Sequence, residues 1–332
     1  MTELLDARSW LITGGCGFIG STLIYRLLKE VPGVNIRILD NLSSGSRDAL
    51  SGAGPFIEKD VLSLKGRPEG LELVIGDIRN PEACIRCCSS VDVVVHLAAS
   101  TGVPQSVENP RADMEANVIG TLNMLEASRR QGIKKFIFAS SGAPLGDVVP
   151  PVHEDKAPRP VSPYGASKLA GEAYCSAYFR TFGVKTIALR FSNVYGHLSK
   201  NKNSVVAKFF KNALAGERIE IYGNGEQTRD FIFIEDLINA IMLSVKADIG
   251  GEVFQIATHK ETTVNEIAEA IKEIVKKETG RDVNIIYSEQ RPGDVKRNFA
   301  DISKAKNILG FEPEHDLKSG LKKTFKYFKN SK

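Results

Sequence analysis

The segment from Trp10 to Asp40 constrains the fold more than any other part of the sequence. An apolar run, WLIT, leads at once into GGCGFIG, which is followed by a helical pattern and a second β-rich run. Gly14, Gly17 and Gly20 are spaced GxxGxxG. Small residues let the backbone turn sharply and approach a pyrophosphate, and the helix that follows presents unpaired N–H groups at its positive dipole end. This order predicts a strand–turn–helix–strand unit that binds a dinucleotide.

The alternation of apolar runs and helical patterns continues through the first half of the chain. The apolar runs show little internal alternation, as expected when helices cover both faces of a parallel sheet. Strands are predicted at 10–13, 35–40, 71–77, 91–99, 134–141 and 184–191, with a helix at 163–181. The predicted fold is α/β, a doubly wound parallel sheet (Rossmann fold) with a smaller C-terminal α/β substrate lobe.

The pattern loosens after Asn193, where short strands alternate with helices. The predicted domains are therefore residues 1–192, which bind the dinucleotide, and residues 193–332, mainly a substrate lobe with strands that return to the sheet. In the second domain Thr263 and Glu266 have the spacing of a capping box, which predicts a helix start.

Composition excludes several classes of protein. The net charge is +4, with Lys and Arg scattered, so no nucleic-acid partner is expected. No apolar run approaches the roughly 18 residues that span a bilayer. The cysteines number five, an odd count without a secretion signal, so a reduced cytoplasm is expected. Cys84, Cys87 and Cys88 lack a fourth ligand and a second CxxC, so no metal is predicted.

Asp40 indicates which dinucleotide binds. It follows Gly20 by twenty residues at the end of a strand, where a carboxylate accepts hydrogen bonds from a ribose 2′-hydroxyl and repels a 2′-phosphate. NAD is therefore expected rather than NADP. Asp77 is expected to meet the adenine amino group, and His96 to be a packed structural histidine. The predicted NAD contacts are Gly14, Gly17, Phe18, Ile19, Gly20, Asp40, Asn41, Asp77, Ile78, Leu97, Ala98, Ala99, Tyr164 and Lys168.

The stretch SPYGASK places Tyr164 and Lys168 four residues apart on one helical face. A phenol has a pKa of about 10 and is a poor base at neutral pH. A neighbouring ammonium and a positive nicotinamide ring would lower that pKa. The pair therefore predicts proton transfer beside a nicotinamide, with Lys168 also hydrogen-bonding the nicotinamide ribose.

With these motifs in place, the chain resembles the extended short-chain dehydrogenase/reductase family, in its NAD-dependent nucleotide-sugar epimerase and dehydratase branch, and is most similar to UDP-sugar 4-epimerases. The resemblance rests on GGCGFIG, HLAA, SPYGASK, RFSNVYG, IYGNGEQTRDF and RPGDVKRNFADISKAKNILG. It implies that Ser141, Tyr164 and Lys168 are catalytic. It also implies a homodimer formed through the helices before and within the YxxxK segment.

Family dehydratases carry an acid pair just after the catalytic hydroxyl residue, and family decarboxylases commonly keep a glutamate there. Here these positions are Gly142 and Ala143, which have no acidic side chain. The resemblance thus implies NAD-dependent 4-epimerisation of a UDP-sugar, namely UDP-glucose/galactose or their N-acetylhexosamine or uronic-acid forms, through a transient 4-keto sugar. The alternatives are a UDP-glucuronate decarboxylase or a nucleotide-sugar dehydratase, a GDP- or dTDP-sugar as substrate, and a non-catalytic NAD-binding regulator.

The resemblance also implies a set of substrate contacts. Asn298 matches the family position beside the C2 substituent of the sugar, and because Asn is much smaller than Tyr, an N-acetyl group is expected to fit. The predicted substrate residues are Ser141, Tyr164, Asn193, Val205, Tyr222, Arg229, Arg291, Asp294 and Asn298.

Overall fold

The computed structural model describes residues 7–200, 202–290 and 296–330. The chain forms two compact units. The first, called the sheet unit here, comprises residues 1–147, 154–190 and 238–254. The second, called the lobe, comprises residues 148–153, 191–237 and 255–332. Neither unit is one continuous stretch of chain, because residues 148–153 join the lobe and residues 238–254 return to the sheet unit.

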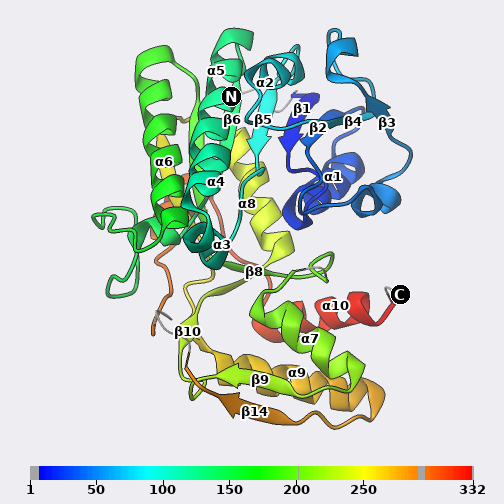
Figure 1. Cartoon of the computed structure of the whole chain (residues 1–332), viewed down its shortest axis with the longest axis vertical. Coiled ribbons are helices and arrows are strands. Elements are labelled where there is room, and N and C mark those ends of the chain that lie inside the picture. Colours follow the sequence, from blue (N-terminus) through cyan, green and yellow to red (C-terminus); the bar gives the residue numbers. More distant parts are fainter. Residues whose placement is uncertain (1–6, 201, 291–295, 331–332) are drawn as a thin grey trace. The chain divides into compact units, whose positions relative to one another are not determined.

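An eight-stranded sheet, in the order β12-β7-β6-β5-β1-β2-β4-β3, forms the core of the sheet unit (Figure 1). The pairs β1–β2, β1–β5, β2–β4, β3–β4 and β5–β6 are parallel. The strands are β1 (Ser9–Thr13), β2 (Asn35–Asp40), β3 (Ile57–Lys59), β4 (Leu71–Ile75), β5 (Val93–His96), β6 (Lys135–Ser141), β7 (Thr186–Phe191) and β12 (Glu252–Ile256). The predicted doubly wound α/β fold is confirmed. β3 was not predicted, because its three residues, two of them exposed, carry little apolar signal.

Helices pack against this sheet. They are α1 (Phe18–Glu30), α2 (Pro81–Cys87), α3 (Val103–Glu108), α4 (Pro110–Met114), α5 (Gly120–Gln131) and α6 (Pro163–Phe182), and a π-helical turn (Glu115–Ile119) joins α4 to α5. Short 3₁₀ turns cover Arg47–Ala53, Val61–Ser63 and Ala143–Leu145. Cys84, Cys87 and Cys88 are buried in one apolar cluster with Leu125 and Phe136. Burial raises the pKa of each of these thiols, so they act as small apolar side chains.

The lobe contains three short strand pairs. β8 (Asn193–Tyr195) runs parallel to β11 (Phe231–Phe233), β9 (Ile219–Tyr222) parallel to β14 (Ile285–Ser288), and β10 (Thr228–Arg229) antiparallel to β13 (Thr262–Thr263). Its helices are α7 (Val205–Ala215), α9 (Val264–Thr279), α10 (Leu317–Asn330) and the start of α8 (Ile234–Lys246), with a π-helical turn at Ala305–Leu309. Figure 1 shows α9 lying along β9 and β14. The Thr263–Glu266 capping box that begins α9 is confirmed.

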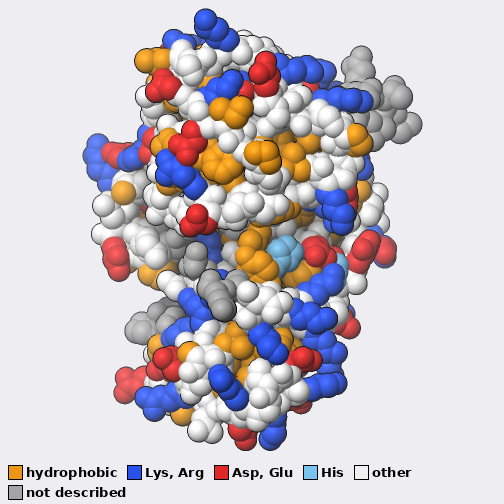
Figure 2. Space-filling model, turned by 90° about the vertical axis from the view of Figure 1, so that its right-hand side faces the viewer, with side chains coloured by type: hydrophobic (Ala, Val, Ile, Leu, Met, Phe, Trp, Pro, Cys, Tyr) orange, Lys and Arg blue, Asp and Glu red, His pale blue; other side chains and the backbone are white. Residues whose placement is uncertain are grey.

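Many charged side chains on the surface form local ion pairs. Figure 2 shows Lys and Arg interspersed with Asp and Glu on the visible face. Arg297 and Glu261, for example, form two hydrogen bonds of 2.7 Å. Exposed pairs of this kind contribute about 0–1 kcal/mol each. Among the described residues, no helix has both the length and the apolar character to cross a membrane.

Candidate functional site

The glycine-rich loop between β1 and α1 forms an open cradle. Gly17 caps α1 without a side-chain hydrogen bond, and the first turn has no acidic residue. Gly14 has a φ of 71°, and a Cβ there would lie 2.8 Å from the backbone nitrogen of Ala98. A Cβ on Gly20 would collide with the Gly14 carbonyl oxygen. Only glycine fits these two positions, and the cradle suits the pyrophosphate of a dinucleotide.

Asp40, at the end of β2, is bonded to this loop. Its Oδ2 accepts a hydrogen bond from the Cys16 N–H at 2.9 Å, and its Oδ1 accepts one from the Leu42 N–H at 2.8 Å. An ionised carboxylate has about four acceptor sites, so two remain for ribose hydroxyls. Burial, reinforced by Asp40, raises the pKa of the Cys16 thiol to about 12. The sequence predicted the ribose contact but not the bond to the loop.

Two further predicted cofactor residues lie together beyond the sheet. Asn41 Nδ2 donates to Asp77 Oδ2 at 2.9 Å. Arg79, which sequence reasoning missed, binds the same carboxylate through Nε at 2.9 Å and Nη2 at 2.8 Å. The Arg79 hydrogen bonds hold the pKa of Asp77 well below its usual range. An adenine amino group would therefore meet an ionised carboxylate that Arg79 already orients.

The chain after β5 closes against the glycine loop. Leu97 N–H donates to the Thr13 carbonyl at 3.2 Å, and Ala98 N–H donates to Thr13 Oγ1 at 3.1 Å. Of the other predicted contacts, Phe18 and Ile78 are buried, Ile19 and Ala99 are half-buried, and Ile78 belongs to the apolar core.

His96 is a buried structural residue at the end of β5. Its Nδ1 lies 2.7 Å from Thr13 Oγ1, and its Nε2 lies 3.2 Å from Thr121 Oγ1. Because the Thr121 hydroxyl already donates to the Asn117 carbonyl at 2.6 Å, its oxygen accepts from Nε2, so the ring proton sits on Nε2 and Nδ1 accepts from the Thr13 hydroxyl. Burial, reinforced by Lys168, lowers the pKa of His96 to about 3. The ring is therefore neutral at physiological pH.

Ser141, Tyr164 and Lys168 come together at the carboxyl end of β6. Ser162 caps α6 by accepting from the Gly165 N–H, which places Tyr164 in the first turn. The Ser141 hydroxyl hydrogen-bonds the Tyr164 hydroxyl. Burial raises the pKa of Tyr164, and the Ser141 hydrogen bond opposes that shift. The pair can therefore pass a proton between its hydroxyls and a bound sugar.

Lys168 is fully enclosed one turn along α6. Its Nζ donates to the Ala139 carbonyl at 2.8 Å and lies 5.9 Å from the centre of the Tyr164 ring. Burial lowers the pKa of Lys168 to about 8, and Asp113 and Glu172 oppose that shift. The ammonium has three donors, so two remain for a ribose or for the phenolate.

The turn after Ser141 has no acidic side chain. Gly142 leads into the 3₁₀ turn at Ala143–Leu145, and Ala143 N–H donates to Ser141 Oγ at 3.2 Å. Pro144 and Leu145 are buried. This turn positions the Ser141 hydroxyl through its backbone and contributes no side-chain proton donor.

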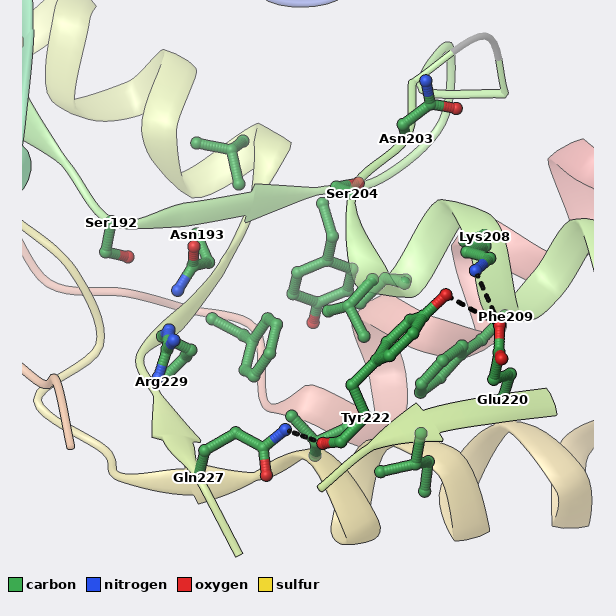
Figure 3. A pocket seen from close by; sticks show the side chains of 17 residues that line it. Ser192, Asn193, Asn203, Ser204, Lys208, Phe209, Glu220, Tyr222, Gln227 and Arg229 are labelled. Atoms are coloured by element: carbon green, nitrogen blue, oxygen red, sulfur yellow. Dashed lines mark hydrogen bonds and ion pairs between the residues drawn. The ribbon is translucent and has the colours of Figure 1, made fainter. Parts of the chain in front are cut away.

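The lobe contains a cavity of about 360 Å³ (Figure 3). Four predicted substrate residues line it, namely Asn193, Val205, Tyr222 and Arg229. The lining residues that sequence reasoning missed include Asn203, Lys208, Glu220 and Gln227. Lys208 is three residues after Val205 on α7, and Glu220 and Tyr222 alternate on β9. The periods of a helix and a strand could therefore have indicated Lys208 and Glu220, whereas Asn203 and Gln227 lie outside helices and strands.

One wall of this cavity is a hydrogen-bonded cluster. Glu220 Oε2 accepts from the Tyr222 hydroxyl at 2.8 Å and lies 3.3 Å from Lys208 Nζ (Figure 3). Lys208 Nζ also lies 5.2 Å from the centre of the Tyr222 ring. Gln227 Nε2 donates to the Tyr222 carbonyl at 2.8 Å. These contacts hold the Tyr222 ring in place, as a surface against which a flat base can pack.

The other predicted substrate residues lie elsewhere. Arg291 and Asp294 lie outside the described residues. Asn298 is half-buried and does not line the cavity, although Lys296, two residues earlier, accepts through its carbonyl from the Thr228 N–H beside Arg229. Asp230 is buried, and it binds the backbone of Thr258 and Ala300. Its role is therefore to hold these chain segments together.

Comparison with known proteins identifies relatives across the whole chain. The model of the NAD dependent epimerase/dehydratase family matches residues 10–257. A UDP-glucose 4-epimerase of Mycolicibacterium smegmatis is 34% identical over 96% of this chain and 98% of its own length. A UDP-glucuronic acid decarboxylase of Xenopus tropicalis is 32% identical over 98% of this chain and 73% of its own.

Solved structures give the same result. A UDP-glucose 4-epimerase of Thermotoga maritima with UDP-glucose is 36% identical, with a TM-score of 0.85 over 96% of this chain and 98% of its own. A UDP-N-acetylglucosamine 4-epimerase of Methanobrevibacter ruminantium, in complex with UDP-N-acetylmuramic acid, is 32% identical, with a TM-score of 0.87 over 97% and 98%. Both fold and sequence therefore place this chain among the same group of proteins.

Proposed function

This chain belongs to the NAD-dependent epimerase/dehydratase family, and we propose that it interconverts the C4 epimers of a UDP-sugar through a transient 4-keto sugar. The observation that carries this proposal is the Ser141–Tyr164 hydrogen bond beside Lys168, followed directly by two residues without acidic groups. Such a site can move a proton on and off a sugar hydroxyl. It lacks a side chain there to protonate a departing hydroxyl.

The residues of the glycine loop and Asp40 fit NAD, which supplies reversible two-electron oxidation at C4 of the sugar when bound. Tyr164 takes the proton of the C4 hydroxyl and later returns it. Ser141 donates a hydrogen bond to the sugar oxygen and stabilises the developing ketone. Because burial raises the pKa of Tyr164, proton acceptance depends on the Ser141 hydrogen bond and on nearby positive charge.

The cavity of the lobe is the proposed nucleotide site. Arg229 brings positive charge to it, and Asn193 adds amide donors. Lys208 also lines the cavity, where its ammonium is paired with Glu220 at 3.3 Å. Arginine and lysine suit a diphosphate, and the held ring of Tyr222 offers a flat apolar face to uracil. Asn298 and the two residues outside the described segments, Arg291 and Asp294, complete the proposed substrate contacts.

Incubating the purified protein with UDP-glucose, UDP-N-acetylglucosamine and UDP-glucuronate, without added NAD, tests the proposal. Proton NMR should show pairs of C4 epimers, and denaturation followed by chromatography should release about one NAD per chain. A pentose product would indicate a decarboxylase. A 4-keto-6-deoxy sugar would indicate a dehydratase. Bound NAD with no turnover of any sugar nucleotide would indicate a regulator.

A homodimer is the proposed assembly. Val107 on α3, Met114 on α4 and Phe182 on α6 are large apolar side chains left exposed on the helices before and within the YxxxK segment. Light scattering on the purified protein should give twice the chain mass, and a monomer at micromolar concentration would contradict this.

The five cysteines are all buried and unpaired, which is compatible with the proposed cytoplasmic location.

A further inference from the structure

Asp113, on α4, is a buried carboxylate with one oxygen left unsatisfied. Only 2% of the surface of Asp113 is exposed to solvent. Oδ1 accepts a hydrogen bond from Asn117 Nδ2 at 2.9 Å, while Oδ2 is buried and has no hydrogen-bond partner among the described residues. Burying a carboxylate without full compensation is unfavourable, so its presence calls for a physical reason.

Asn117 connects Asp113 to the first turn of α6. Its Nδ2 lies 3.1 Å from Ser167 Oγ and 3.0 Å from the Ser100 carbonyl, and its Oδ1 accepts from the Ser100 N–H at 2.8 Å. The Ser167 hydroxyl donates to the Tyr164 carbonyl at 3.0 Å. Asp113 therefore lies behind the helical turn that carries both Tyr164 and Lys168.

Asp113 differs from the other carboxylate near Lys168 in having no ion-pair partner among the described residues. From α6 itself, Glu172 and Cys175 face Lys168, and from β5 the neutral ring of His96 does so. The negative charge of Glu172 is already paired, because its carboxylate forms two hydrogen bonds of 2.8 Å with Arg190 of β7 and also accepts from the Ser140 hydroxyl of β6. Asp113, from α4, forms no ion pair within the part of the chain that the structure describes.

We propose that Asp113 is a positioning residue of this site: through Asn117 it holds the first turn of α6, and its charge maintains Lys168 as an ammonium beside Tyr164. The inference rests on the proposed function. The charge of Asp113 shifts the pKa values of Lys168 and Tyr164 in the same direction. It raises the pKa of Lys168, against the effect of burial, and it also raises the pKa of Tyr164.

The substitution Asp113→Asn separates charge from hydrogen bonding. The amide oxygen can still accept from Asn117, while the negative charge is lost. The matched control is Glu115→Gln, which removes a half-exposed carboxylate two residues away that pairs with Arg111 at 3.0 Å. Asp113→Ser is a second neutral variant, should the Asn variant fold poorly.

The first measurement does not require turnover. In protein labelled with ¹³Cε-lysine, the Lys168 signal, assigned with Lys168→Met, is titrated in each variant. The Lys168 pKa should fall by roughly one unit in the Asp113 variants, and it should stay unchanged in Glu115→Gln. An unchanged Lys168 pKa in Asp113→Asn and Asp113→Ser would overturn the inference, whether or not the protein epimerises sugars.

The second measurement is the pH profile of kcat. Removing a negative charge lowers the pKa of both Tyr164 and Lys168, so the acid and alkaline limbs should move together to lower pH. Activity above the alkaline limb should fall roughly tenfold relative to wild type, as a one-unit shift requires. A uniform loss at all pH values with fixed limbs would show a purely structural role. Wild type without any turnover would refute the proposed function and leave the titration as the test of Asp113.

Discussion

The carboxylate of Asp40 accepts a hydrogen bond from the backbone N–H of Cys16 at 2.9 Å, across 24 residues of sequence. This bond joins the end of β2 to the glycine loop that leads into α1. Asp40, which is expected to bind the ribose hydroxyls, therefore also holds the glycine loop, which is expected to bind the pyrophosphate. Loss of this carboxylate should affect stability and cofactor binding together.

Replacing Asp40 with Ser should lower the free energy of unfolding by roughly 1–3 kcal/mol, because the buried Cys16 N–H and the part-buried Leu42 N–H lose their acceptor. The purified variant should also retain much less NAD than wild type. Urea unfolding and chromatography of the released cofactor measure the two effects. The control is Asp48→Ser on the exposed 3₁₀ turn. Full NAD content in Asp40→Ser would contradict the ribose assignment.

Tyr164→Phe should lower kcat by roughly 10²-fold or more, since general acid–base catalysis typically contributes 10²–10⁴. Binding of NAD and of UDP should persist, because the ring remains in place. Tyr174→Phe, on the same helix but half-exposed, is the matched control. Turnover of Tyr164→Phe at the wild-type rate would remove Tyr164 from the proton-transfer step.

His96 should make stability depend on pH in the acid range. Its folded pKa is about 3, below its ordinary value of 6.5, so between these pH values only the unfolded chain binds the proton. Stability from this group is therefore complete above pH 6.5 and falls as the pH drops towards 3, by at most about 1.4 kcal/mol per pH unit.

Urea unfolding of wild type and His96→Gln between pH 4 and 7 measures this effect. The variant should show a shallower decline in stability on acidification, even if it is less stable throughout. His153→Gln, at a half-buried histidine of the lobe, should keep the wild-type slope. Parallel curves for wild type and His96→Gln would mean that other groups cause the acid sensitivity.

Arg229→Met should raise the dissociation constant for UDP by about tenfold or more, because a hydrogen bond to a charged group contributes about 1.5–3 kcal/mol. Titration calorimetry with UDP measures this without turnover. Arg281→Met, an exposed arginine of the lobe that donates to the Leu214 carbonyl, is the control. Equal affinities of wild type and Arg229→Met would place the diphosphate elsewhere.

Asn298→Tyr should depress kcat/KM for UDP-N-acetylglucosamine much more than for UDP-glucose. A bulky ring beside C2 excludes the acetyl group by a steric clash, whereas the smaller sugar still fits. Measuring both substrates with wild type and variant gives the ratio. Because Asn298 does not line the cavity, an unchanged ratio would show that it packs only within the lobe.

The sequence by itself determined the features that depend on neighbours along the chain. The strand–glycine loop–helix order, the spacing of Tyr164 and Lys168, and the capping box of Thr263 and Glu266 follow from local geometry, since the periods of a helix and a strand are fixed by the backbone. The doubly wound sheet followed because most of its strands are apolar runs between helices, β3 being the exception.

Only the tertiary structure decided which distant residues meet. Asn117 meets Ser167 across 50 residues, and Glu220 meets Ser288 across 68. The return of residues 238–254 to the sheet unit is of the same kind. Such contacts depend on how helices and strands pack, and a single polar residue carries no pattern that indicates its partner. The loop bond of Asp40, the setting of Lys168 and the hydrogen bonds within the wall of the lobe cavity were therefore decided by packing alone.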